Sequence, residues 1–131
     1  MRVVTDGDRY YILQRVFGDD CHVRTLPSGE TTTMLAASLS PADIEAALET
    51  VDDGLADERV GSNAAAGLLL ELVVDGPASA RGLLDRFDVC ESDLHGTVAE
   101  LRAAGLLEPT TVHGQRGYRA IIDGSQRVET P

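Results

Sequence analysis

The chain has 131 residues, of which 43% are hydrophobic and 25% are charged, a composition typical of one ordinary or two very small globular domains. Its 22 acidic and 11 basic residues give a formal net charge of -11, and every basic residue is an arginine. Two cysteines are too few for a disulfide framework, and the longest apolar run, Ala64 to Leu70, is far shorter than a membrane span. With no apolar stretch of signal-peptide length near Met1, the sequence predicts a cytoplasmic protein that does not enter a membrane.

The first 39 residues predict a small antiparallel β-meander. Four short segments rich in β-branched and aromatic residues alternate with turns that contain glycine and aspartate. A sheet with so few large apolar residues is marginal alone, so we expect it to pack on the next helix, on the C-terminal half or on a second subunit. The predicted strands are Arg2 to Thr5, Arg9 to Arg15, Cys21 to Thr25 and Thr31 to Leu35.

Residues 40–61 predict a linker helix followed by an acidic connector. Ser40 is a favourable N-cap, and Pro41 suits the first helical position. Apolar residues at Ile44, Leu48 and Val51 fall on one helical face. The acidic, glycine-containing stretch from Asp52 to Gly61 places a domain boundary here.

Residues 62–122 predict three short helices and a β-hairpin. The first helix runs from Asn63 to Val74, and Ser79 is the expected N-cap of the second. In the third helix, Leu94, Val98 and Leu101 recur at helical spacing and form one buried stripe. A strand pair with a glycine-rich tip at residues 113–117 then follows, and residues 123–131 are expected to be a flexible tail. The predicted fold class is therefore α+β.

This order of elements resembles the winged helix-turn-helix regulators of the ArsR and MarR types. The most specific piece is the segment from Val89 to Leu107, which resembles a recognition helix and its exit and ends in LRAAGLL. The resemblance covers about half of the chain. It implies a homodimeric transcriptional regulator that binds double-stranded DNA with the helix from Glu91 to Ala104 and the wing from Thr110 to Ile122. The N-terminal module would then supply a dimer contact, an effector site or a protein-partner surface.

The same resemblance implies which residues meet DNA. Residues near the start of the recognition helix would face base edges, and those of the wing would face the backbone or the minor groove. The predicted DNA-binding residues are Ser79, Arg81, Glu91, Ser92, Asp93, His95, Gly96, Arg102, His113, Gln115, Arg116 and Arg119.

The charge of this half departs from the usual pattern of DNA-binding domains, since phosphate contacts normally come from basic residues. From Ser62 onward there are six arginines, at positions 81, 86, 102, 116, 119 and 127, against ten acidic residues. An acidic chain without lysine is similar in composition to the proteins of halophilic archaea, and concentrated salt would weaken the repulsion between such a surface and DNA. A high-GC genome is the alternative source of the arginine bias. The competing function is a protein-interaction adaptor whose winged helix does not bind DNA.

The remaining candidate residues predict no catalytic site, metal or cofactor. Cys90 and His95 are five residues apart on a helix, which does not place two ligands on one face, and Cys21 with His22 would have to complete the set. Redox sensing by Cys90 is the alternative to an inert cysteine. Acidic clusters predict solvated surfaces rather than cation sites. The aromatic residues Tyr10, Tyr11 and Phe17 indicate the core or dimer contact of the sheet, with a ligand cleft as the alternative.

Overall fold

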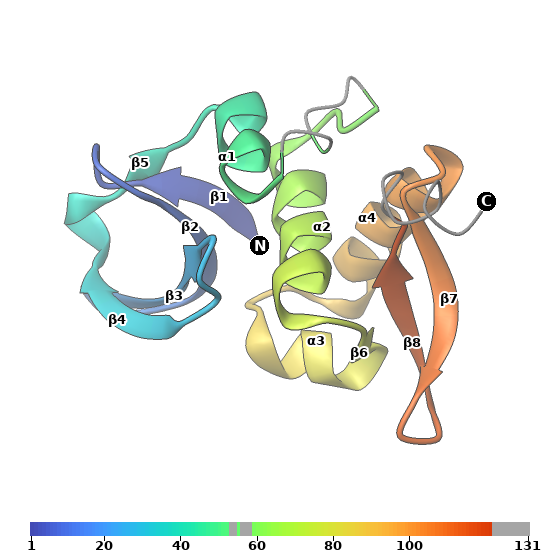
Figure 1. The fold of residues 1–131 in the computed structure, drawn as a ribbon. Helices are drawn as coiled ribbons and strands as arrows, with labels where there is room; N and C mark the ends of the chain where they lie inside the picture. The colour runs from blue at the N-terminus through green and yellow to red at the C-terminus, as the bar shows by residue number, and fades with distance from the viewer. Residues whose placement is uncertain (53–54, 56–58, 122–131) are drawn as a thin grey trace.

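The computed structural model describes residues 1–52, 55 and 59–121. Within them the protein is a mixed α+β fold, in which two antiparallel sheets lie on either side of a group of helices (Figure 1). No helix in this part of the chain has the length and apolar character needed to cross a bilayer. The predicted tail at residues 123–131, Ile122 and part of the acidic connector (53–54 and 56–58) lie outside the described residues.

The N-terminal sheet has the strand order β4-β3-β2-β1-β5 and confirms the predicted antiparallel meander. One face directs Val3, Ile12 and Leu26 toward the helices. The other face curls around a second small cluster that contains Val4, Tyr11, Cys21 and Val23. The first four strands are β1 (Arg2–Thr5), β2 (Tyr10–Phe17), β3 (Asp20–Leu26) and β4 (Thr31–Leu35).

The predicted helix start at Ser40 is wrong. A short 3-10 helix, η1 (Ala36–Ser38), is followed by the two-residue strand β5 (Ser40–Pro41), which pairs with Val4 and Thr5. Helix α1 (Ile44–Val51) begins only after Asp43, whose carboxylate accepts a 3.0 Å hydrogen bond from the backbone N–H of Ala46. Aspartate is as good an N-cap as serine, and pairing with β1 keeps the preceding residues extended.

The C-terminal half contains helix α2 (Asn63–Asp75), strand β6 (Ala78–Ser79), helix α3 (Ala80–Arg86) and helix α4 (Glu91–Ala103). Strands β7 (Leu107–Val112) and β8 (Gln115–Ala120) complete a second sheet, with the order β6-β8-β7. The predicted cap at Ser79 is confirmed, because its hydroxyl accepts a 3.0 Å hydrogen bond from the backbone N–H of Gly82.

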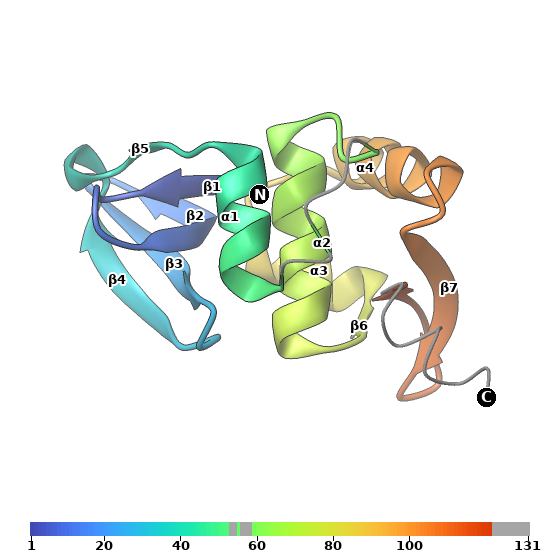
Figure 2. The same ribbon diagram turned by 45° about the horizontal axis from the view of Figure 1, so that its top comes forward.

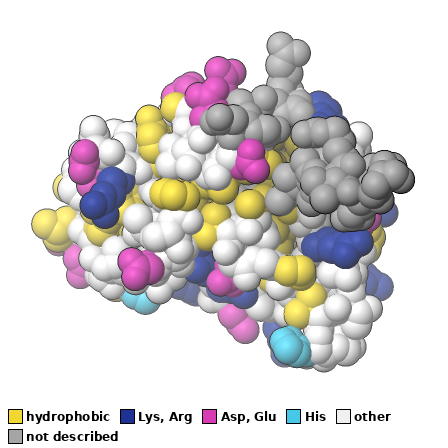
Figure 3. All heavy atoms as spheres, in the orientation of Figure 1, with side chains coloured by type: hydrophobic (Ala, Val, Ile, Leu, Met, Phe, Trp, Pro, Cys, Tyr) yellow, Lys and Arg dark blue, Asp and Glu magenta, His cyan; other side chains and the backbone are white. Residues whose placement is uncertain are grey.

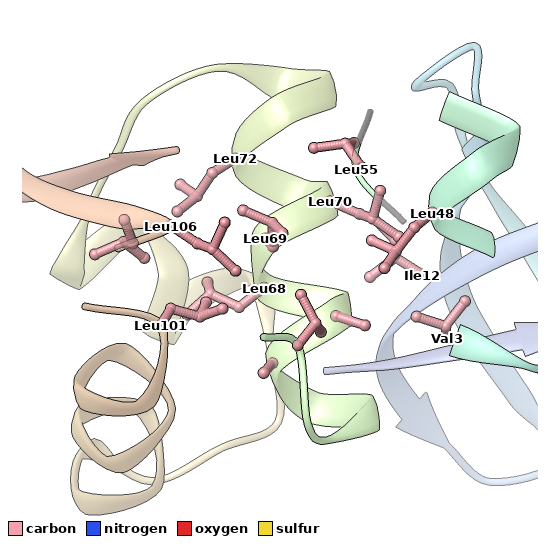
Figure 4. Close-up of a cluster of buried hydrophobic side chains, with 14 of the residues drawn as sticks. Val3, Ile12, Leu48, Leu55, Leu68, Leu69, Leu70, Leu72, Leu101 and Leu106 are labelled. Atoms are coloured by element: carbon pink, nitrogen blue, oxygen red, sulfur yellow. The ribbon is translucent and has the colours of Figure 1, made fainter. Parts of the chain in front are cut away.

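Helix α2 lies at the centre of one continuous core, and every residue from Ala65 to Leu72 is buried. Figure 4 shows side chains leaving this helix in opposite directions. Leu68 and Leu69 face Leu101 and Leu106, whereas Leu70 faces Leu48 and Ile12 of the N-terminal half. A helix that is apolar around most of its circumference is typical of a protein interior. The sheet therefore packs on both α1 and α2, as expected for a sheet too small to be stable alone.

Candidate functional site

Helix α4 is attached to the protein along one stripe and presents the rest of its surface outward. Leu94 and Leu101 have no exposed surface, and Val98 is 5% exposed. The helix begins at Glu91, as the sequence predicts, and ends at Ala103, one residue earlier than predicted; Cys90 occupies the N-cap position. The α4 residues predicted to meet DNA are all exposed, namely Glu91, Ser92, Asp93, His95, Gly96 and Arg102.

One flank of α4 forms a wall of an open groove of about 530 Å³. The opposite wall is made by the chain start at Met1 and Arg2 and by the residues that begin α2. At the groove's end the carboxylate of Glu100 accepts a hydrogen bond from the hydroxyl of Ser62, with O–O distances of 3.1 and 3.2 Å. The α4 residues lining the groove are Ser92, Asp93, Gly96, Thr97 and Glu100, whereas Glu91, His95 and Arg102 lie outside it.

Strands β7 and β8 form a hairpin with a tighter turn than predicted. The expected tip at residues 113–117 is reduced to His113 and Gly114, and Val112 pairs directly with Gln115. Both turn residues have positive φ, 51° for His113 and 77° for Gly114, as a two-residue type I′ turn requires. The predicted tip residues Gln115 and Arg116 therefore lie on strand β8 rather than in a loop. Arg119 lies on the same strand, as predicted, and all three are exposed like His113.

Some of the six arginines that follow Ser62 are engaged in ion pairs and are not free to bind phosphate. Arg86 is bound to Glu71 and Asp75, and Arg119 forms an ion pair with Glu108 on β7. Arg127 lies outside the described residues. Among the described residues, no ion pair or side-chain hydrogen bond engages the exposed Arg81, Arg102 and Arg116. Figure 3 shows dark blue arginine side chains along the side of the molecule that β7 and β8 form.

A buried cluster of charges joins the two halves of the chain, and sequence reasoning missed it. The Glu71 side chain has no exposed surface. Its two oxygens accept hydrogen bonds from Arg24 Nε at 3.0 Å and Arg24 Nη2 at 2.9 Å, in the bidentate geometry of strong arginine–carboxylate pairs. Arg86 Nη1 lies 2.9 Å from Glu71 Oε2, and Gln14 Nε2 lies 3.3 Å from both oxygens.

Two carboxylates balance the two guanidinium groups of this buried cluster. One turn after Glu71, Asp75 contacts Arg86 Nη1 at 3.0 Å and Arg24 Nη1 at 3.5 Å. Burial lowers the pKa of Arg24, but the hydrogen bonds and the attraction from Glu71 outweigh it and hold that pKa above its ordinary value. The cluster connects β2, β3, α2 and α3, so it fixes the sheet relative to the helices that carry the site.

A second contact clamps the turn between α3 and α4 to the N-terminal sheet. A register shift in β2 between Leu13 and Arg15 leaves the chain locally unpaired, as at a β-bulge. There Arg15 donates to the backbone carbonyl of Asp85 and to the Asp88 carboxylate, at 2.7 and 3.1 Å. The backbone N–H of Val16 donates to the same carboxylate at 3.0 Å. The N-terminal sheet therefore acts as a platform that sets where α4 begins.

The cysteine, acidic and aromatic candidates do not converge on one site. Among the described residues, no group of three or more histidine, cysteine or acidic side chains could hold a metal ion. Cys21 is buried and Cys90 is exposed. Asp6 accepts hydrogen bonds from the backbone N–H groups of Arg9 and Asp8, which lower the pKa of its carboxyl group. Of the predicted aromatic core, Tyr11 is buried, Tyr10 is half-buried and Phe17 is 46% exposed.

Comparison with known proteins assigns nearly the whole chain to one family. No curated protein and no solved structure matches it. A family model described as a family of unknown function (DUF7346) matches residues 1–130. Because the match covers nearly the whole chain, both halves of the structure are parts of one family pattern. The protein belongs to the family of unknown function DUF7346.

Proposed function

We propose that residues 62–121 form a winged helix-turn-helix that binds double-stranded DNA, and that the protein is a transcriptional regulator acting as a homodimer. The observation that carries the proposal is the free outer face of α4 next to the β7–β8 hairpin. In such domains the helix after the turn enters the major groove. The strand order β6-β8-β7 and the succession of α2, α3 and α4 support the same assignment.

The charge of the outer face sets the conditions under which DNA would bind. Arg81, Arg102 and Arg116 are the candidates for phosphate contact, and Glu91 or Asp93 would accept from the amino group of cytosine. Repulsion between these carboxylates and phosphates weakens as salt rises, because the Debye length falls to about 3 Å at 1 M. We therefore expect DNA binding to take place in concentrated salt, where counterion release contributes less to affinity.

Replacing Arg116 by alanine is expected to weaken DNA binding about tenfold, to a similar extent for every sequence, because a phosphate contact carries little sequence information. Adding Arg81→Ala should weaken binding further and lower the slope of log K against log salt by about two in total. Fluorescence anisotropy with labelled duplexes, selected from genomic fragments in molar KCl, measures both quantities. Arg9→Ala is the matched control, since it removes an exposed arginine from the turn between β1 and β2.

Gly96 gives a second, independent test of the same surface. A glycine in the middle of a helix costs about 1 kcal/mol relative to alanine, yet a Cβ at Gly96 would meet nothing within 4 Å. No described neighbour requires this glycine, whereas a close partner on α4 would. Gly96→Ala is therefore expected to raise the free energy of unfolding by about 1 kcal/mol and to weaken DNA binding about tenfold. Chemical denaturation and anisotropy on the same samples check the two opposite effects.

The acidic residues of α4 favour one competing function, an adaptor that binds another protein through this face. The two proposals differ in what the variants do. If Arg116→Ala and Arg9→Ala bind every duplex equally, or the wild-type chain binds none in molar KCl, DNA binding is rejected. Retained capture of a protein partner by Arg116→Ala, together with its loss in Gly96→Ala, would then support the adaptor.

A further inference from the structure

The N-terminal sheet ends in two very different edges. Strand β5 has only two residues, and one of them is Pro41, which has no N–H to offer a neighbour. Strand β4 at the other end has five residues, and Thr31, Thr32, Thr33 and Leu35 are exposed. Sheet edges in monomers are normally protected by charges, prolines or shortness. Strand β4 has none of these protections.

The hydrogen-bond pattern tells which backbone groups of β4 point away from the sheet. In an antiparallel pair, bonded and non-bonded positions alternate. The N–H of Ala36 donates to Asp19 at 2.9 Å, and the N–H of Thr25 donates to Glu30 at 2.7 Å. The alternation between these two bonds directs the backbone groups of Thr32 and Met34 toward β3. Those of Thr31, Thr33 and Leu35 are directed outward, where no described strand receives them. The outward C=O of Leu35 accepts a 2.7 Å hydrogen bond from the Ser38 hydroxyl and keeps a second lone pair for a neighbouring strand.

These three outward positions match a second copy of themselves. If two β4 strands meet antiparallel around a two-fold axis at Thr33, then Thr33 faces Thr33 and Thr31 faces Leu35 of the other copy. Each of these facing residues has its N–H and C=O directed across the axis, so every outward group of both strands finds a partner. Threonine opposite threonine is also a favourable cross-strand pair.

The distribution of charge favours a second copy at the same place. With a net charge of -11, two copies of this chain repel each other over most of their surfaces. Residues 31–42 contain no charged side chain. Beside β4 lie two of the large exposed apolar side chains, Leu35 at 61% and Phe17 at 46%, both in register with Asp20 and so on the same face of the sheet.

We propose that β4 pairs with β4 of a second copy, so that two five-stranded sheets form one continuous sheet across a two-fold axis. The assembly stops at two copies, because the other edge of each sheet is the proline-containing β5, which does not accept a third copy. Strand β4 lies on the opposite side of the molecule from the β7–β8 hairpin (Figures 1 and 2). The dimer therefore leaves α4 and the hairpin of both copies free.

Mass measurement by light scattering on a sizing column, in moderate salt and without DNA, tests this contact. The wild-type chain is expected to have the mass of a dimer. Thr33→Lys and Thr33→Glu each place like charges opposite one another at the axis and are each expected to be monomeric. Mixing the two variants should restore a dimer, because lysine then faces glutamate. Only a contact in which residue 33 meets itself predicts this recovery.

Ser40→Lys is the matched control, since it adds the same charge to the opposite edge and should leave the dimer intact. Thermal melts of all three variants establish that each is folded. A monomeric wild-type chain, or a Thr33→Lys variant that stays dimeric, overturns the proposal. Because no DNA is present, such a result leaves DNA binding by α4 standing. Conversely, a dimer that binds no DNA removes only the proposed function.

Discussion

Replacing Glu71 by alanine is expected to lower the free energy of unfolding by about 3–5 kcal/mol, the cost typical of removing one partner from a buried ion cluster. The Arg24 side chain is 9% exposed and would keep its charge without the carboxylate that binds it bidentately. Arg86 would lose its contact with Glu71 and keep only the one with Asp75. Urea denaturation followed by circular dichroism, in the salt that stabilises the wild-type chain, measures the change.

Two further variants separate the buried charge from side-chain volume and from general effects. Glu71→Gln keeps the shape of the side chain but removes its charge. Its free energy of unfolding should therefore fall between those of the wild type and Glu71→Ala. Glu49→Ala changes an exposed residue of α1 and should stay within about 0.5 kcal/mol. Added salt should not rescue Glu71→Ala, because screening acts weakly on buried charges. A loss below about 1 kcal/mol would mean that the cluster contributes little to stability.

Elements specified by local patterns could be predicted from the sequence. The stripe of Leu94, Val98 and Leu101 predicted the buried side of α4, and Ser79 predicted the start of α3. Each of these patterns lies within a few helical turns, so the structure that it predicts does not depend on residues far away in the sequence. The strands of the N-terminal meander were predictable for the same reason, because each is bounded by its own turn.

Features that depend on distant residues could not be predicted. Gln14 and Glu71, which are hydrogen-bonded in the buried cluster, are 57 positions apart in the sequence. The sequence around an acidic residue in an apolar helix does not indicate which arginine it will bind. The choice between Ser40 and Asp43 as the cap of α1 was decided by pairing with β1. One signal was available for α2: its run from Ala64 to Leu70 is apolar on every side, which indicates a helix buried on several faces.

Replacing Gly117 by alanine is the second change with a large expected effect. Gly117 lies in β8, where it pairs with Ser79 of β6, and a Cβ there would be 2.5 Å from the carbonyl oxygen of Ala78 and 2.9 Å from Val112. The nearer contact is with backbone, which has no alternative rotamer, so β6 and β8 must separate. We expect a loss of about 1–3 kcal/mol in the free energy of unfolding, as for other overpacked sites.

The same substitution at Gly96 is its natural comparison, since both replace glycine by alanine in the C-terminal half. Gly96→Ala fills open space and should stabilise, whereas Gly117→Ala displaces a strand and should destabilise. Both should weaken DNA binding, one by blocking the close approach to α4 and the other by shifting the hairpin. If Gly117→Ala is destabilised yet binds DNA normally, the hairpin does not act as a wing. Binding would then rest on α4 alone.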